Sequence, residues 1–335
     1  MLKPVEISYK IEYNIWGGFG KIMKRIILVV LLVIIIAFGI ATYDSILNKN
    51  EMAASPDAKE ENSSWTITEY GSAGEEQMMS FSIEGNVDGL VIVDGGYENV
   101  EGDVNNILEV IKKHNNVVDT WVVTHLDADH AGVFLNIMKN HPEVTIKNVY
   151  TENIPELEKC KASTPWEVDW STYEDFVRFG TENENIKSLS EGDIIEDVIG
   201  LNLEVLWSYS EWVDTYSSNI LNNGALIFKL SGNEESILFF ADVQDEKVGN
   251  ELIRKHQDKL KADYVQIGHH GNNSMPDEIY DMINPKVAFI PAPNWIFENP
   301  NKVAWYTAEK IRNLLTEKGV TVYSDKDCPI SVTMK

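Results

Sequence analysis

Cysteine is scarce in this chain: Cys160 and Cys328 are the two that it has among 335 residues. Two cysteines so far apart exclude a zinc finger and a disulfide framework, because both need several cysteines at short, regular spacings. If the domain is exported, the two thiols can pair, and free buried thiols are equally consistent with the sequence. Their pairing stays open at this point.

Basic residues are also few. The chain has 28 Lys and Arg against 53 Asp and Glu, a formal net charge of −25. Residues 1–50 hold six of the basic and three of the acidic residues, so the remainder has 22 against 50, a net charge of −28. A field of this sign repels polyanions, so nucleic acid is a disfavoured partner.

Charge is absent from residues 26–41, sixteen consecutive apolar or small residues that follow Lys24 and Arg25. This length lies between a signal-peptide core and a comfortable membrane span, so residues 26–43 are predicted to be a transmembrane anchor or a signal segment. Basic residues before the run stay in the cytoplasm, which sends the rest of the chain outside. The domain is then extracellular on a single N-terminal span, or secreted if the chain is cleaved near Gly39–Ala41.

Three further segments surround this run. Residues 1–25 are a basic cytoplasmic leader, within which Met23 is an alternative start. Residues 44–64 are polar and acidic and are predicted to be a flexible linker. Residues 65–335 alternate strand-like and helix-like patterns and are long enough for one full-sized core, so we expect a single globular domain there.

No P-loop, Rossmann glycine pattern or internal repeat appears in the sequence. Residues 124–132 instead read Thr-His-Leu-Asp-Ala-Asp-His-Ala-Gly, between a strand-like run and a helix-like pattern. The donor residues of this segment are His125, Asp127, Asp129 and His130. Their offsets of 0, 2, 4 and 5 match neither one face of a helix nor one side of a strand. They indicate a loop at a strand end, where α/β sheets carry ligand sites. The simpler alternative is a solvated turn in which Asp129 caps the following helix.

A metal ion is the better explanation of this loop. Four oxygen and nitrogen donors so close together are costly to desolvate unless a cation lies among them. Other strand-like runs end in the same kinds of residue: Asp94 before two glycines, Asp242, and the pair His269 and His270 between glycines. Paired histidines flanked by glycines are hard to explain as core packing, so His269 and His270 join the candidate site.

The His-x-Asp-x-Asp-His string resembles the signature of the metallo-β-lactamase superfamily, whose usual form is His-x-His-x-Asp-His. Asp127 stands where the usual form has its second histidine. This variant is similar to the hydrolase domain of bacterial competence DNA-uptake channel proteins and to choline-phosphate esterases. The resemblance covers about residues 65–335. It implies an α/β fold, a four-layer αββα metallo-β-lactamase sandwich, which the N-terminal apolar helix precedes.

The resemblance also implies a two-metal site. Its ligands are His125, Asp127, Asp129, His130, Asp242 and His270. The first two hold one ion, Asp242 bridges, and the other three hold the second ion. Asp94 and Asn223 support these ligands from behind. The mixture of imidazole and carboxylate ligands suits Zn²⁺ or Mn²⁺.

One expected ligand is missing. Lactamase-type sites take a third histidine for the first ion from a position before the bridging aspartate, but no histidine lies between His141 and Asp242. Asn222-Asn223 stands where competence-type domains carry asparagine. We therefore expect one firmly bound metal ion and a second, weaker one.

The predicted activity is hydrolysis by a metal-activated water, most simply of a phosphoester, by a phosphodiesterase or nuclease. The substrate is then a small-molecule or cell-wall phosphoester. Two alternatives are hydrolysis of a lactam, lactone or thioester, and a non-catalytic metal-binding or DNA-receiving module.

The predicted catalytic residues are Asp129 and His269. The resemblance makes His270 a metal ligand, and neighbours on an extended segment point to opposite sides, so His269 is expected to face the substrate. Trp295 and Phe297 are expected either to wall the substrate pocket or to cover the core.

Overall fold

The computed structural model describes residues 63–164, 168–183, 185–273 and 275–335. Residues Ser63–Lys335 form one compact unit. The predicted leader, the apolar run at 26–43 and nearly all of the predicted linker lie outside the described residues. Among the helices that are described, none has the length and apolar character needed to cross a membrane.

The fold is built on two mixed sheets of seven strands each. In spatial order the first sheet contains β14 (Ile330–Met334), β1 (Trp65–Glu69), β2 (Ser80–Gly85), β3 (Leu90–Asp94), β4 (Val117–Val123), β5 (Thr145–Glu152) and β6 (Ile186–Leu189). The second contains β13 (Thr321–Ser324), β12 (Val287–Ile290), β11 (Tyr264–Gln266), β10 (Ser236–Phe239), β9 (Ile227–Ser231), β8 (Leu201–Trp207) and β7 (Ile194–Val198).

The two sheets have the same plan. In the first, β14, β1, β2 and β3 pair antiparallel, and β3 to β6 pair parallel. In the second, β7 to β10 pair antiparallel, and β10 to β13 pair parallel. The chain returns to the first sheet only with its last strand, β14, which lies beside β1.

Alternation along the strands separates two apolar layers. In β3, Val91 and Val93 belong to a cluster that includes Phe228 and Phe239 of the second sheet, so these side chains fill the space between the sheets. Leu90 and Ile92 point the other way, into the layer beneath the helices. A period of two therefore gives each central strand one face toward the partner sheet and one toward helices.

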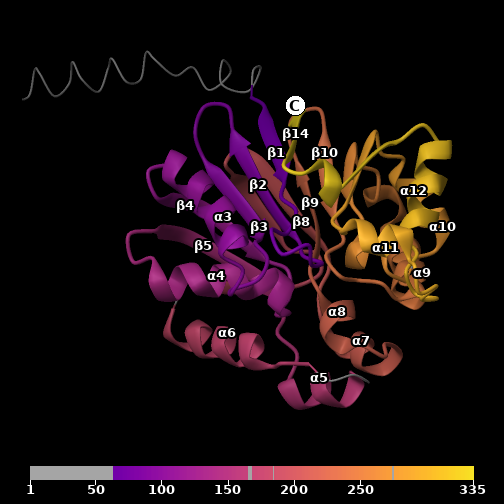
Figure 1. The fold of residues 1–335 in the computed structure, drawn as a ribbon, viewed down its shortest axis with the longest axis horizontal. Coiled ribbons are helices and arrows are strands. Elements are labelled where there is room, and N and C mark those ends of the chain that lie inside the picture. Colours follow the sequence, from indigo (N-terminus) through magenta and orange to yellow (C-terminus); the bar gives the residue numbers. More distant parts are fainter. Residues whose placement is uncertain (1–62, 165–167, 184, 274) are drawn as a thin grey trace, which may run out of the picture. The chain divides into compact units, whose positions relative to one another are not determined.

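The helices cover the outer faces. Their bounds are α3 (Glu101–Lys113), α4 (Ala128–Asn140), α5 (Leu157–Ser163), α6 (Ser171–Glu182), α7 (Glu211–Tyr216), α8 (Ile220–Gly224), α9 (Glu246–His256), α10 (Asp277–Ile283), α11 (Asn294–Glu298) and α12 (Ala308–Glu317), with short 3₁₀ turns η1 (Gln257–Lys259), η2 (Gly268–Gly271) and η3 (Asp325–Asp327). Helices α3, α4 and α6 lie on one side of the sheets, and α9 to α12 lie on the other (Figure 1).

Helix α3 shows why these segments dock. Val104, Ile107, Leu108 and Ile111 recur at the spacing of one helical face, and all four are buried. Burying each such side chain contributes roughly 1.5–3 kcal/mol relative to exposure, which is far more than the helix propensity of the same residues. The result is a four-layer α/β sandwich in which the carboxyl ends of β3, β4, β10 and β11 come together at one edge, where the candidate residues lie.

Candidate metal centre

The loop after β4 supplies the first group of ligands. His125 follows the strand and is fully buried, and α4 begins at Ala128. The N-cap residue of α4 is Asp127, not Asp129, and its side chain accepts no capping hydrogen bond. The simpler alternative, a turn capped by Asp129, is therefore wrong: the Asp127 carboxylate is free to act as a ligand, and Asp129 lies in the first turn of the helix.

Gly132 allows this helix to start where it does. A Cβ atom at this position would lie 2.4 Å from the backbone nitrogen of Glu98 and 2.7 Å from the carbonyl oxygen of Gly96. Both are backbone atoms of the segment after β3, which cannot move aside cheaply. The glycine of the sequence motif thus lets the first turn of α4 pack directly on that segment.

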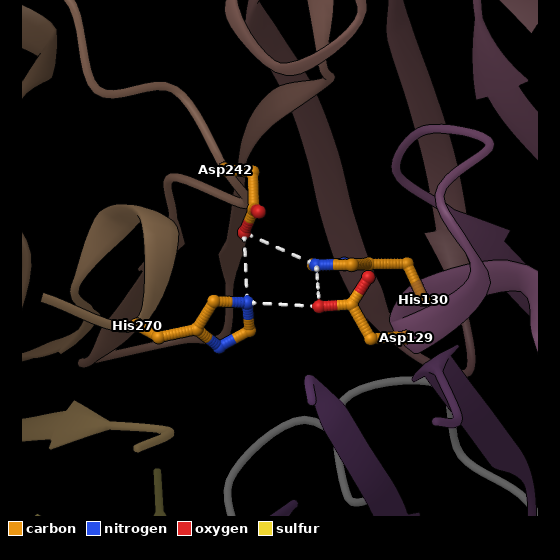
Figure 2. A group of neighbouring side chains, drawn as sticks. All are labelled: Asp129, His130, Asp242 and His270. Carbon is orange, nitrogen blue, oxygen red and sulfur yellow. Dashed lines mark ion pairs between the residues drawn. The ribbon is translucent and has the colours of Figure 1, made fainter. Parts of the chain in front are cut away.

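Four side chains from the two halves of the fold converge on one point, as Figure 2 shows. They are Asp129, His130, Asp242 and His270, and their ligand atoms all lie within 4.8 Å of one another. Asp242 follows β10, and His270 lies in η2 after β11. His130 Nε2 is 3.1 Å from Asp242 Oδ1, and His270 Nε2 is 3.2 Å from Asp129 Oδ2.

The donor atoms of this cluster fit a metal ion. His130 Nε2, His270 Nε2 and Asp242 Oδ1 are buried and have no hydrogen-bond partner. The other ring nitrogen of each histidine is engaged: His130 Nδ1 lies 2.7 Å from Asp94 Oδ2, and His270 Nδ1 lies 2.8 Å from the Pro291 carbonyl oxygen. These acceptors keep a proton on each Nδ1, so once the cluster binds a cation each Nε2 can offer its lone pair to it, the arrangement that metal-binding histidines need.

Without a metal, protons balance the charge of the cluster. Burial alone would lower the pKa of His270, but the carboxylates of Asp242 and Asp129 raise it to about 10. The same carboxylates hold the pKa of His130 well above its usual value against burial. In return, His130 and His270 hold the pKa of the buried Asp242 well below its usual value. A divalent cation would displace these protons, so metal binding releases them.

Asp94 holds the ligand loop in place from behind. It is fully buried, and its two oxygens accept hydrogen bonds from the backbone nitrogen and the hydroxyl of Thr124, both at 2.7 Å. Its backbone is left-handed, with φ at 55°. Asp94 thus orients the Thr124–His125 turn and the His130 ring together, as its predicted supporting role requires.

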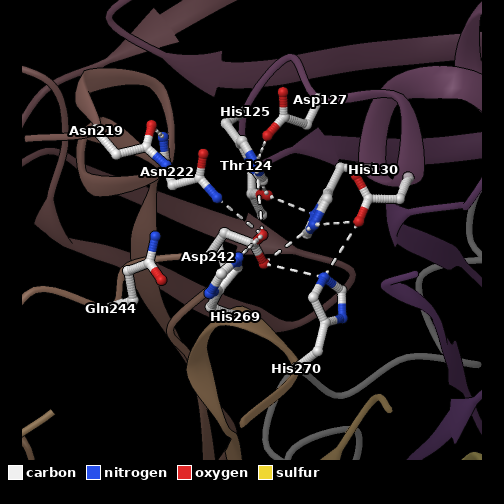
Figure 3. Close-up of polar contacts among 12 residues, drawn as sticks. Thr124, His125, Asp127, His130, Asn219, Asn222, Asp242, Gln244, His269 and His270 are labelled. Atoms are coloured by element: carbon white, nitrogen blue, oxygen red, sulfur yellow. Dashed lines mark hydrogen bonds and ion pairs between the residues drawn. The ribbon is translucent and has the colours of Figure 1, made fainter. Parts of the chain in front are cut away.

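His125 and Asp127 lie beside this cluster rather than inside it (Figure 3). His125 Nε2 is 3.4 Å from Asp127 Oδ2 and 3.9 Å from Asp242 Oδ2. The same Asp242 oxygen accepts a hydrogen bond of 3.2 Å from the side chain of Asn222. Asp242 therefore presents one oxygen to each group of ligands.

Asn222, not its neighbour, contacts the Asp242 carboxylate. Asn223 acts one step away: its side-chain oxygen accepts hydrogen bonds from the backbone nitrogens of Gln244 and Asp245, and its amide donates to Ser217 Oγ. These bonds fix the loop that leaves Asp242. The predicted supporting residue thus shapes the site through that loop.

The expected geometry of the histidine pair is wrong. His269 and His270 are not on an extended segment; both have left-handed backbones, with φ at 47° and 54°. As a result their side chains do not point to opposite sides. His269 Nε2 lies 3.8 Å from Asp242 Oδ2, and His270 Nε2 lies 3.5 Å from Asp242 Oδ1.

A cavity of about 560 Å³ opens over the ligands. It is lined by Asp127, Asp129, His269 and the aromatic side chains of Trp305 and Tyr306, among others. None of the described residues that line it is Lys or Arg. Of the two alternatives for Phe297 and Trp295, Phe297 takes the core role and is buried, whereas Trp295 lines a separate cavity.

Sequence reasoning also missed Glu152. This residue ends β5 at the same sheet edge, is fully buried, and neither carboxylate oxygen has a hydrogen-bond partner. Burial, followed by the nearby charges of Asp127 and Asp94, raises its pKa well above the usual value. Its place at the carboxyl end of a parallel strand next to β4 was the available signal.

Residues 74–161, which contain the ligand loop of β4, match the family model of the metallo-beta-lactamase superfamily. Over these residues the chain is similar to metallo-β-lactamase superfamily proteins. The resemblance read from the His-x-Asp-x-Asp-His string is confirmed, as is the α/β sandwich with two mixed sheets. Members of this superfamily are generally metal-dependent hydrolases, and the metallo-β-lactamase fold implies a divalent metal, for which the described residues provide a His/Asp cluster.

Individual proteins resemble the chain more distantly. ComE operon protein 3 of Bacillus subtilis is 26% identical over 212 residues, which are 61% of this chain and 24% of that protein. The chain therefore spans about a quarter of this curated relative. Among solved structures, the metallo-beta-lactamase fold protein YhfI of Bacillus subtilis is 11% identical with a TM-score of 0.47, and Zn²⁺-bound PqqB of Methylobacterium extorquens is 10% identical with the same score. Each comparison covers 81% of this chain and 99% of the other.

Proposed function

We propose that this metallo-β-lactamase domain is a metal-dependent hydrolase of a small phosphoester. The observation that carries the proposal is the cluster of buried ligand atoms without hydrogen-bond partners at the floor of the 560 Å³ cavity. A bound divalent ion there supplies a Lewis acid and lowers the pKa of a water to near neutrality. Asp129, His130, Asp242 and His270 would hold it.

The protein groups around the cluster suggest how a substrate is handled. His269 lies beside the Asp242 carboxylate and lines the cavity, so it is placed to donate a proton to a leaving oxygen. Asp129 would help to hold the metal, and its carboxylate lies 3.2 Å from His270 Nε2. Trp305 and Tyr306 offer an aromatic wall for the non-reacting part of the substrate.

The negative charge of Asp127, which lies beside His125 at the proposed weaker metal site, favours phosphoester chemistry. Asp127 adds a carboxylate where lactamase-type sites have a neutral histidine, and this lowers the electrophilicity of an ion bound there toward a carbonyl. Phosphoryl transfer depends more on positioning and on neutralising oxygens, and tolerates that charge better. One observation favours a neutral lactam, lactone or thioester instead: the described lining of the cavity has no Lys or Arg to meet a phosphate.

The substrate is proposed to be small rather than a polymer. The net charge of −28 outside residues 1–50 repels extended polyanions. A small-molecule or cell-wall phosphoester presents only one or two charges. DNA or RNA would need the repulsion to be screened by salt.

Export and the metal complement complete the proposal. The apolar segment at 26–43, with its preceding basic residues, would place the domain outside the cell membrane as an anchored or secreted protein. Zn²⁺ or Mn²⁺ is the proposed ion, with one site firmer than the other. Protease added to intact cells should then digest the domain, or the domain should appear in the medium; protection by an intact envelope would contradict export.

A panel of substrates tests the activity. The purified, metal-loaded chain should hydrolyse a chromogenic phosphodiester faster than a cephalosporin or single-stranded DNA. The Asp242→Asn variant should hydrolyse the diester no faster than buffer without protein. Cephalosporin hydrolysis without diesterase activity would establish the carbonyl alternative. Firm metal binding without turnover of any substrate in the panel would favour the non-catalytic module.

A further inference from the structure

A second group of ligand-type side chains lies outside the metal centre and shares no residue with it. Glu69, Asp325 and Cys328 bring ligand atoms within 4.8 Å of one another. Glu69 is the last residue of β1 in the first sheet, while the other two belong to the turn around η3 that carries the chain from β13 to β14. The group therefore joins the two sheets where the chain crosses between them.

Among the described residues, the carboxylates of this group form no ion pair with Lys, Arg or His. Glu69 is fully buried, and none of the four carboxylate oxygens of Glu69 and Asp325 has a hydrogen-bond partner. Burial and the neighbouring Asp325 raise the pKa of Glu69, and burial raises the pKa of Asp325 to about 7. Two acids placed together like this are costly unless protons or a cation neutralise them.

The thiol adds a softer ligand. Cys328 is free and partly buried, and its Sγ lies 3.8 Å from the Ser324 carbonyl oxygen. Burial, and then the charges of Glu69 and Asp325, raise its pKa, so the thiol stays protonated while the group is empty of cations. A thiophilic cation reverses this, because a coordinating thiol is deprotonated outright.

Access to the group is open from one side. A cavity of about 440 Å³ is lined by Asp325 and Cys328, together with Thr68, Tyr70 and Ser331. A cavity of this size holds water, which can supply a fourth ligand and an entry path.

We propose that Glu69, Asp325 and Cys328 form a second cation site, specific for a thiophilic divalent ion of the Zn²⁺, Co²⁺ or Cd²⁺ type. On binding, the Cys328 S–H bond breaks, a metal–sulfur bond forms, and the proton leaves to solvent with any proton held by the two carboxyls. Hard ions such as Mg²⁺ and Ca²⁺ are not expected, because they do not prefer thiolate. The ion would tie the turn before β14 to the end of β1, and so stabilise the closure of the first sheet.

Cobalt tests the proposal independently of catalysis. The full chain titrated with Co²⁺ should develop a thiolate-to-cobalt charge-transfer absorption, which the metal centre cannot produce because its described ligands include no cysteine. Cys328→Ser should abolish the absorption and reduce bound Co²⁺ by one equivalent. Cys160→Ser is the matched control, since Cys160 is also a free, buried thiol but belongs to α5, and it should leave the absorption unchanged.

A second variant covers the case in which Cys328→Ser does not fold. Glu69→Gln keeps the shape of the side chain and removes its charge. This variant should bind Co²⁺ at this site at least about tenfold more weakly. At high Co²⁺ concentration it should still develop the charge-transfer absorption. No charge-transfer absorption in the unmodified chain would overturn the proposal and leave a group of protonated acids. Loss of the absorption in Cys160→Ser instead of Cys328→Ser would overturn it as well.

Discussion

The Nδ1 atom of His130 lies 2.7 Å from Oδ2 of Asp94, and this contact decides which ring nitrogen faces the metal centre. The same carboxylate accepts two hydrogen bonds from Thr124, so one buried aspartate holds both the ligand loop and the first histidine of α4. Asp94 comes from β3 and His130 from the segment after β4, which are neighbouring parallel strands. The support is therefore built into the sheet.

Asp94→Asn should weaken metal binding about 10- to 100-fold, the usual effect of losing a partner behind a metal-binding histidine. Asparagine tolerates the left-handed backbone of this position, so the fold should survive. Competition with a chromogenic chelator measures the affinity. Asp119→Asn, on β4 away from the centre, should bind like the unmodified chain, and equal affinity of the two variants would refute the role given to Asp94.

Metal removal should occur in two stages. In a Cys328→Ser chain, which isolates the metal centre, one equivalent should remain after mild dialysis, because Asp129, His130, Asp242 and His270 provide a full set of ligands. A second equivalent should bind only when free metal is added. Elemental analysis gives both numbers. Two equivalents retained through dialysis would mean that the group around His125 contains a ligand not recognised above.

His270→Ala should lose the retained metal, whereas His269→Ala should keep it and lose activity. His270 Nε2 faces the two carboxylates of the four-residue cluster, while His269 lies at the cavity next to the other oxygen of Asp242. Loss of a proton donor should lower kcat for the diester about 10²- to 10⁴-fold. If His269→Ala also loses metal, His269 is a ligand of the weaker ion and occupies the place of the missing histidine.

Trp305→Ala should raise KM for a diester with an aromatic group by roughly two- to tenfold at unchanged kcat, the effect of losing about 0.5–1.5 kcal/mol of aromatic contact. Trp305 lines the cavity and is 56% exposed, so its removal should not disturb the core. Trp295→Ala is the control: that indole donates to the Glu75 carbonyl oxygen and lines another cavity. Equal KM changes in both variants would show that Trp305 does not contact substrate.

Glu152→Gln should stabilise the metal-free protein, and more so as the pH rises. The pKa of Glu152 is raised well above its ordinary value of 4.5, so above that pH the unfolded chain has released a proton that the native protein still holds. The free energy of unfolding then falls by up to about 1.4 kcal/mol for each pH unit above 4.5, and glutamine, which does not titrate, removes this loss. Urea unfolding at pH 5 and pH 8 measures it. Glu158→Gln, at an exposed position of α5, should show no such trend; parallel pH curves for Glu152→Gln and the unmodified chain would contradict the prediction.

Much of the site could be predicted because its chemistry is local in sequence. The donors of residues 124–132 are adjacent, and Asp94, Asp242 and His270 each follow a strand that the alternation of apolar residues reveals. Parallel strands place their carboxyl ends at one edge, so the convergence of these residues follows from the order of strands. The pair Asn222-Asn223 could also be predicted to lie near Asp242, although the residue that contacts the Asp242 carboxylate is Asn222 and not Asn223.

Other features depend on packing that the sequence pattern does not record. Residues 303–318 have a helix-like pattern, but α12 begins at Ala308, because Asn299 holds the preceding segment through hydrogen bonds to both backbone groups of Val303. The left-handed backbones of His269 and His270 arise in a tight turn, where Gly271 packs on Ala308. Both histidines face Asp242 only because of this turn.

Residue type and spacing by themselves determined the family, the ligand loop and the α/β alternation, since metal ligands and strand periodicity are short-range properties of the chain. The tertiary structure alone decided which aromatic side chains wall the cavity, that Glu152 is buried beside the metal centre, and that Glu69 lies with Asp325 and Cys328. These groupings join distant segments, and their positions follow from how the two sheets pack and how β14 returns to β1, which no local pattern encodes.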